Sequence, residues 1–162
     1  MQVVYARDRP EVISRSMMLL GPSPRGETDP KWDWRRTEAL PILEELGFNG
    51  QVVIPLPEAG PFVEEEDNYD AQPEWEIDYI LKVNAKVMWM PRDLVVLPGF
   101  TSNVELGLCA SLHGFVYGRP DGAPKTRYLD YVVRRFHKQR PHTTLRATLQ
   151  EAISYLNRTR DD

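Results

Sequence analysis

The stretch Lys86–Gly107, KVMWMPRDLVVLPGFTSNVELG, contains the pattern that decides the fold. Its first residues form a short apolar run, which is typical of a strand buried on both faces of a sheet. A loop with Pro98 and Gly99 follows, and from Thr101 the spacing of apolar residues predicts a short helix that Gly114 ends. A buried strand that leads through a loop into a helix is the repeating unit of a parallel α/β sheet.

The same unit recurs along the chain. We expect strands in residues 1–6, 17–20, 50–57 and 115–118, and helices in residues 31–47, 73–85, 125–138 and 144–158. Pro41 predicts a kink or a late start in the first of these helices, and in the second we expect Ile77, Ile80 and Leu81 to face inward. Residues 58–70, with the acidic run EEED, are expected to form a polar loop.

This alternation predicts an α/β fold with a central, mostly parallel sheet. We expect one domain over residues 1–162, with a helical C-terminal tail at about 124–158. The net charge of −4 argues against a dedicated nucleic-acid-binding protein. No apolar run reaches the roughly 20 residues that cross a bilayer, and the first residues lack the layout of a signal peptide.

Cysteine and histidine usage narrows the class further. The single cysteine, Cys109, cannot form an internal disulfide, which indicates a reducing, cytoplasmic location. The three histidines, His113, His137 and His142, show no metal-ligand spacing, so we expect no metal site.

Ligands of open parallel sheets bind beyond the carboxyl ends of the strands. That rule selects the sequence GPSPR at residues 21–25, the loop before Trp75, and PGFTSNVE at residues 98–105. Arg92 and Asp93, which precede the last of these segments, are candidates for an ion pair at the loop mouth.

Two interpretations of Glu105 are open. Ser102-Asn103-Val104-Glu105 fits the capping-box pattern, in which the glutamate would reach back to the backbone N–H of Ser102. Alternatively, a carboxylate at a helix N-terminus above the sheet edge lies in the ligand crevice. The helix dipole would then keep it ionised, as a nucleophile or general base requires.

The motifs LLGPSP, a following WR helix, a WE helix start and MPRDLVVLPGFTSNVELG together resemble the nucleoside 2-deoxyribosyltransferase-like family. The resemblance spans roughly Met17 to Gly118, and it implies a flavodoxin-like three-layer sandwich. It also implies cleavage or exchange of N-glycosidic bonds in nucleosides or nucleotides without a cofactor. Glu105 stands at the position of the glutamate that attacks the anomeric carbon and forms a glycosyl ester.

A second acid is needed to protonate the departing base. Glu76 shares a helical stripe with Ile80 and Val83 and is expected to point toward the sheet. The spacing in better-known family members favours Asp78 instead, and a plain surface acid is the alternative for both residues.

The resemblance and the loop chemistry give a set of candidate substrate-binding residues. They are Gly21, Ser23, Arg25, Trp34, Arg35, Phe100, Thr101, Ser102 and Asn103. Trp34 could equally be a core residue and Arg35 a structural ion-pair partner. Gly99 and Phe100 stand in the region where better-known members carry an aspartate that holds the sugar, so sugar recognition must differ.

Two rival functions remain open. One is a nucleoside 5′-monophosphate hydrolase, with Ser23, Arg25 and Ser102 binding the phosphate. The other is a module that only binds a nucleotide, in which Glu105 merely caps its helix. The resemblance also implies a homodimer or higher homo-oligomer whose neighbouring subunits complete each pocket. Neither a membrane nor a nucleic-acid polymer is an expected partner.

Overall fold

The computed structural model describes residues 1–24, 29–60 and 69–159. Its strands are β1 (Gln2–Val4), β2 (Ser16–Leu20), β3 (Gln51–Val53), β4 (Ala85–Trp89) and β5 (Phe115–Gly118). Its helical segments are the 3₁₀ turn η1 (Pro30–Trp32), the π-helical turn η2 (Arg35–Ala39), and the α-helices α1 (Leu40–Glu45), α2 (Ala71–Lys82), α3 (Phe100–Cys109), α4 (Arg127–His137) and α5 (Leu145–Arg158). The expected alternation of strands and helices is present.

All five strands are parallel, in the order β1-β3-β2-β4-β5. The predicted α/β, flavodoxin-like three-layer fold is therefore confirmed. From the central β2–β4 pair, the chain moves outward to β3 on one side and to β5 on the other. This reversal creates a topological switch point at the carboxyl ends of β2 and β4, which is where open α/β sheets bind ligands.

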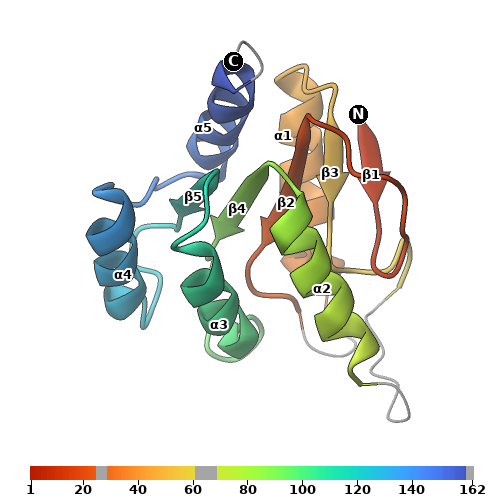
Figure 1. Ribbon diagram of the computed structural model, residues 1–162. Coiled ribbons are helices and arrows are strands. Elements are labelled where there is room, and N and C mark those ends of the chain that lie inside the picture. Colours follow the sequence, from red (N-terminus) through yellow and green to blue (C-terminus); the bar gives the residue numbers. More distant parts are fainter. Residues whose placement is uncertain (25–28, 61–68, 160–162) are drawn as a thin grey trace.

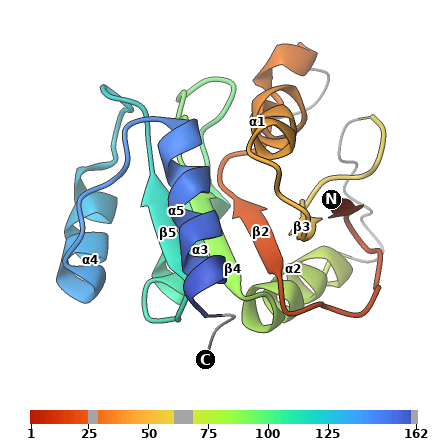
Figure 2. The same ribbon diagram turned by 90° about the horizontal axis from the view of Figure 1, so that it is seen from above.

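Helices cover both faces of the sheet (Figure 1, Figure 2). Successive side chains of a strand point to opposite faces of the sheet, so alternate strand residues belong to two separate hydrophobic cores. Met18 and Leu20 pack with α2, α3 and α4 on one face, while Met17 and Leu19 pack with α1 and α5 on the other. Strands buried on both faces explain why the sequence shows continuous apolar runs rather than alternation.

Pro41 does not end the helix predicted over residues 31–47, which continues through it to Glu45, but the regular α-helix starts late, which is one of the two predicted outcomes. A proline has no N–H to donate, so the carbonyl of Thr37 receives no ordinary i→i+4 bond from it. The amide of Leu40 instead bonds to the carbonyl of Arg35, which gives the wider π-helical turn η2. The regular helix α1 begins only at Leu40.

The inward face of α2 differs in part from the prediction. Ile80 is buried as expected, but Ile77 and Leu81 are 46% and 59% exposed. Two aromatic residues, Trp75 and Tyr79, occupy the buried face instead. Each donates a hydrogen bond to the backbone of the N-terminal segment, so their polar atoms are satisfied while their rings fill the core.

The two C-terminal helices belong to the layers rather than to a tail. α5 packs on β4 and β5, and α4 lies at the edge of the molecule beside β5 and α3 (Figure 1). Among the described residues, every helix is too short or too polar to cross a lipid bilayer.

Two glycines bring the loops after β2 and β4 together at the switch point. Gly21 has φ +139°, and a Cβ there would lie 2.0 Å from the carbonyl oxygen of Trp89. Gly99 has φ +60°, and a Cβ there would lie 2.7 Å from a ring carbon of Pro22. Only glycine allows both the positive φ and the close approach.

Replacing Gly21 with alanine should therefore lower the free energy of unfolding by about 3 kcal/mol, because backbone must move and the conformation is strained. Thermal melts should show a fall in Tm of about 2–4 °C per kcal/mol. The control is Gly107→Ala in the exposed interior of α3, where a Cβ meets nothing within 4 Å. That change should stabilise the protein by about 0.5–1 kcal/mol. A G21A protein that melts like wild type would contradict this packing.

Candidate active site

A small cavity of about 120 Å³ opens at the switch point. Its lining residues are Gly21, Ser23, Pro55, Glu76, Gly99, Phe100, Thr101 and Glu105. They come from the loops after β2, β3 and β4 and from the helices α2 and α3. The fold thus brings together predicted site residues from three separate stretches of sequence, and two of them are carboxylates.

Glu105 projects from the second turn of α3, because the helix begins earlier than predicted. Gly99 precedes the first turn in a left-handed conformation, and no side chain caps the helix. Ser102 is already its third residue, so the capping box is not formed. Glu105 is half-buried, but its Oε2 is fully buried and has no hydrogen-bond partner among the described residues. An unsatisfied buried carboxylate oxygen is costly and therefore needs an explanation beyond packing.

Glu76 and Asp78 lie on different faces of α2. Glu76 lines the cavity, and its Oε1 accepts a hydrogen bond of 2.9 Å from the side-chain amide of Gln72. Asp78 lies on the solvent side, where it pairs with Arg9 at 3.4 Å and with Lys82 at 3.2 Å. The helical stripe predicted Glu76, which lines the cavity, whereas the spacing in better-known family members predicted Asp78, which does not.

Arg35 is fully buried behind the cavity. Its Nε donates to the carbonyl of Leu19 at 2.8 Å, and its Nη2 donates to the carbonyl of Gly21 at 2.7 Å. Its Nη1 donates to the carbonyl of Pro22 at 3.3 Å and to Oγ of Ser23 at 3.2 Å. The guanidinium thus fixes the loop after β2. No ion pair joins it to either cavity carboxylate within the described ranges.

The three charged groups perturb one another. Burial and, to a smaller extent, the nearby charge of Glu76 together raise the pKa of Glu105 to about 7, against the opposing charge of Arg35. Burial also raises the pKa of Glu76, against the opposing hydrogen bond from Gln72 and the charge of Arg35. Burial lowers the pKa of Arg35 to about 10. Burial therefore acts against the helix dipole, which favours the ionised form of Glu105.

The remaining candidate residues divide into two groups. Phe100 and Thr101 are exposed and line the cavity. Trp34 is 2% exposed, and its indole N–H donates to a carbonyl of the loop after β2 at 2.9 Å, as its core interpretation predicts. Ser102 is 1% exposed and does not line the cavity. Arg25 lies outside the described residues.

Arg92 is a positioning residue whose role the sequence did not reveal. It donates to the carbonyl of Gly99 at 3.2 Å, to the carbonyl of Lys125 at 3.0 Å, and to the side-chain oxygen of Asn103. The predicted pairing with Asp93 is wrong, because that carboxylate accepts from two backbone amides of its own loop. The sequence feature that could have indicated this role is an arginine that follows closely after a buried strand.

No protein-family model matches the chain, and no curated protein matches it either. In the described part of the chain, no group of three or more His, Cys, Asp or Glu side chains is placed to hold a metal ion. The geometry of the two carboxylates and the buried arginine, together with the motif resemblance, is therefore what supports a function.

The raised pKa of Glu105 makes a prediction about stability. A carboxyl whose pKa rises from 4.5 to about 7 on folding holds its proton in the folded state between those values. Stability from this group is present at low pH and is lost as pH rises toward 7.

Glu105→Gln cannot ionise, so its Tm should exceed that of wild type by several degrees at about pH 8 and by much less at about pH 5. Asp78→Asn, the matched change at an ion-paired surface acid, should show no such gain at the higher pH. A constant difference between E105Q and wild type across this range would contradict the burial of an ionisable Glu105.

Proposed function

We propose that this protein cleaves the N-glycosidic bond of a nucleoside or nucleotide, with Glu105 as nucleophile and Glu76 as general acid. One observation carries the proposal. The buried Oε2 of Glu105 has no hydrogen-bond partner in the described part of the chain, and Glu105 and a second carboxylate, Glu76, line one cavity at the sheet's switch point. The motif resemblance to nucleoside 2-deoxyribosyltransferase-like proteins points to the same chemistry.

In the first step, a carboxylate oxygen of ionised Glu105 forms a bond to the anomeric carbon while the bond from that carbon to the base nitrogen breaks. The electron pair of the broken bond leaves with the base, and protonated Glu76 supplies the proton that neutralises it. Negative charge on Glu105 stabilises the oxocarbenium-like transition state, as in retaining glycosidases. The product is a glycosyl ester of Glu105 and a free base.

In the second step, water or another base attacks the anomeric carbon and displaces Glu105 as a carboxylate. Glu76, now ionised, accepts the proton that the attacking group loses. Hydrolysis and base exchange therefore use the same residues and differ only in the acceptor.

The cavity volume fits the sugar rather than the whole substrate. Its roughly 120 Å³ is well below the roughly 300–1,000 Å³ of pockets that enclose a complete drug-sized ligand. The furanose ring would be enclosed between Glu105 and Glu76, with the base toward the open side. Phe100, whose side chain is 66% exposed, lines that side and offers a ring for stacking.

Arg35 supplies a fixed positive charge. Because its donors bind backbone carbonyls and Ser23 rather than the carboxylates, it lowers the cost of ionising Glu105 without occupying the oxygen that attacks. Near neutral pH, the cavity pair would share one proton. The first step needs that proton on Glu76, so substrate binding would have to move it from Glu105, the acid whose pKa is raised more.

The 5′-monophosphate hydrolase is the second candidate. Ser23 lines the cavity in support of it, while the burial of Ser102 removes one of the expected phosphate ligands. Homo-oligomeric assembly and a cytoplasmic location remain predictions from the sequence and the resemblance.

Catalysis can be tested by incubating the protein with a panel of nucleosides and their 5′-monophosphates, with and without a second free base. Released or exchanged base is then measured by chromatography. Glu105→Ala should lower the rate by about 10³-fold or more, because the covalent route is lost. Glu76→Gln should slow release most for bases that leave poorly.

Asp78→Asn is the matched control for Glu76→Gln, since both change one acid on α2 and only Glu76 lines the cavity. It should leave the rate unchanged. Tight binding of nucleotides without any released base would instead indicate a binding module, and equal activity of the Glu105 variant would remove its role as nucleophile.

The pH profile of kcat/KM, which reports the free enzyme, tests the charge coupling. Activity should fall as pH drops below about 7, because Glu105 becomes protonated and can no longer attack. In Glu76→Gln, the acidic limb should move to lower pH, since a neighbouring negative charge has been removed. An unmoved limb would show that the two carboxylates do not interact.

A further inference from the structure

The outer face of α4 carries an unusual set of side chains. Arg127, Tyr131 and Arg134 follow one another at i, i+4 and i+7, and Tyr128 and Arg135 lie beside them on the same face. All five are exposed, with Tyr128 at 75% and Tyr131 at 53%. We call this set the α4 face. The tyrosine rings lie 6.5 Å apart, and the Arg134 guanidinium lies 5.7 Å from the ring of Tyr131.

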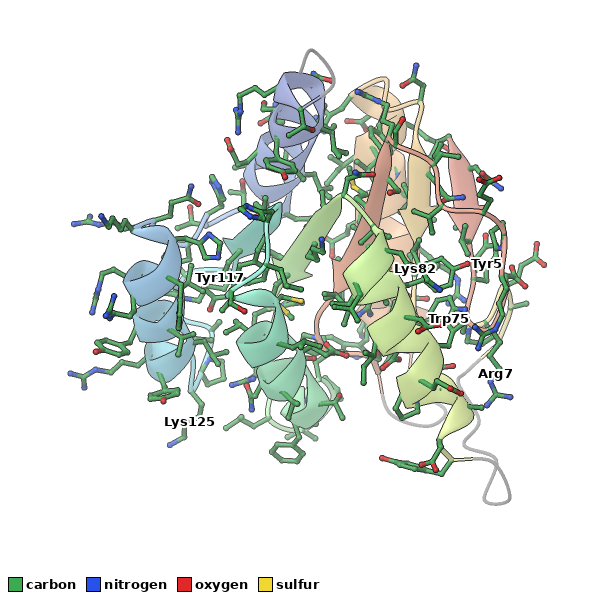
Figure 3. All side chains as sticks on the ribbon, viewed as in Figure 1. Tyr5, Arg7, Trp75, Lys82, Tyr117 and Lys125 are labelled. Carbon is green, nitrogen blue, oxygen red and sulfur yellow. The ribbon has the colours of Figure 1, made fainter. Side chains whose placement is uncertain are left out.

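The positive charge of the α4 face is not neutralised. Residues 125–140 contain six lysines and arginines and one acid, Asp130, for a net charge of +5. Asp130 turns inward, where it pairs with Arg119 at 2.9 Å and accepts a hydrogen bond from Tyr117, which lies between β5 and α4 (Figure 3). Among the ion pairs of the described residues, none involves Arg127, Arg134 or Arg135.

Helix stability does not explain this arrangement. Cations in the last turn interact well with the helix dipole, which accounts for Arg134 and Arg135. Arg127 occupies the first turn and Lys125 precedes it, at the positive end of the dipole, where cations are unfavourable. Figure 3 shows Lys125 projecting at this end of α4, away from the sheet.

We propose that the α4 face binds single-stranded nucleic acid, with its arginines on phosphates and its tyrosines stacked on bases. Exposed aromatic rings interleaved with unpaired arginines are what such sites use. The proposal does not rest on the proposed catalytic function. Whole-chain charge predicts no such partner, but residues 1–124 hold 11 basic and 20 acidic residues, so their net charge of −9 conceals the basic segment.

One further observation favours a single strand over a membrane, and another favours it over a duplex. Of the apolar residues of α4, Leu129 and Val133 are buried in the core and Val132 is partly buried. Phe136, at 61% exposure, is by itself too little to form an apolar face that inserts into lipid. A cavity of about 440 Å³ also adjoins the C-terminal end of α4, lined by Phe136, His137 and Tyr155 among others. Unpaired bases can turn into such a cavity, whereas bases within a duplex cannot.

The test is fluorescence anisotropy with a labelled single-stranded oligonucleotide of about 12 nucleotides of mixed sequence. Wild type should bind with a Kd of about 10 µM at about 50 mM salt, weakening with a log–log slope of about −2 for three phosphate contacts. The triple variant R127Q/R134Q/R135Q should bind at least about tenfold more weakly with a flatter slope. Y128A/Y131A should bind about tenfold more weakly with an unchanged slope, and Y128F/Y131F should bind like wild type, because stacking needs only the ring.

The matched control, K31Q/K82Q/R146Q, removes the same charge at ion-paired surface positions outside α4 and outside the cavity at its C-terminal end. It should bind like wild type. No binding at about 100 µM protein, equal losses in the two triple variants, or duplex bound as tightly as single strand would overturn the proposal. The proposal would also be overturned if the protein sedimented with anionic vesicles but did not bind the oligonucleotide. Salt-sensitive self-association through the α4 face, without oligonucleotide binding, would overturn it too.

Discussion

The buried guanidinium of Arg35 is the contact on which the cavity depends. A charged group in the core is tolerated only when its donors are satisfied. Here they bind one carbonyl of β2, and two carbonyls and one hydroxyl of the loop after it. Those bonds hold Gly21 and Ser23 in place as cavity walls. The same charge opposes the upward pKa shifts of Glu76 and Glu105, so it lowers the cost of holding an ionised carboxylate in this cavity.

The fold could be predicted from the sequence because it depends on apolar runs and breakers that act locally. KVMWMP and MMLL each contain most of a strand buried on both faces, and the missing N–H of Pro41 accounts for the π-helical turn before the regular helix α1. The failures on α2 have a common cause. Periodicity marks Ile77 and Leu81 as apolar, but it does not rank them against Trp75 and Tyr79, which fill more of the core and bond the N-terminal segment.

The sequence predicted which acids form the site, but it did not predict their pKa values. The switch-point rule and the helical stripe place Glu105 and Glu76 together. The start of α3 was misjudged because Gly99, in the left-handed conformation, replaces a side-chain cap. The raised pKa of Glu105 depends on burial by residues distant in sequence, so no local pattern reports it. Arg92 was assigned to its neighbour Asp93, although its true partners come from the α3 and α4 loops.

Several departures from ordinary structural rules lie at one edge of this sheet. A π-helical turn, a glycine at φ +139°, an uncapped helix start, a buried arginine and a carboxylate oxygen without a partner among the described residues all lie around one small cavity. Other departures lie elsewhere, such as the left-handed backbone of Lys125 and Lys138, but they are scattered along the chain. Natural sequences break local rules mainly where function requires it. The clustering is therefore evidence for a site that is independent of any motif, and it would stand even if the chemistry proposed for Glu105 had to change.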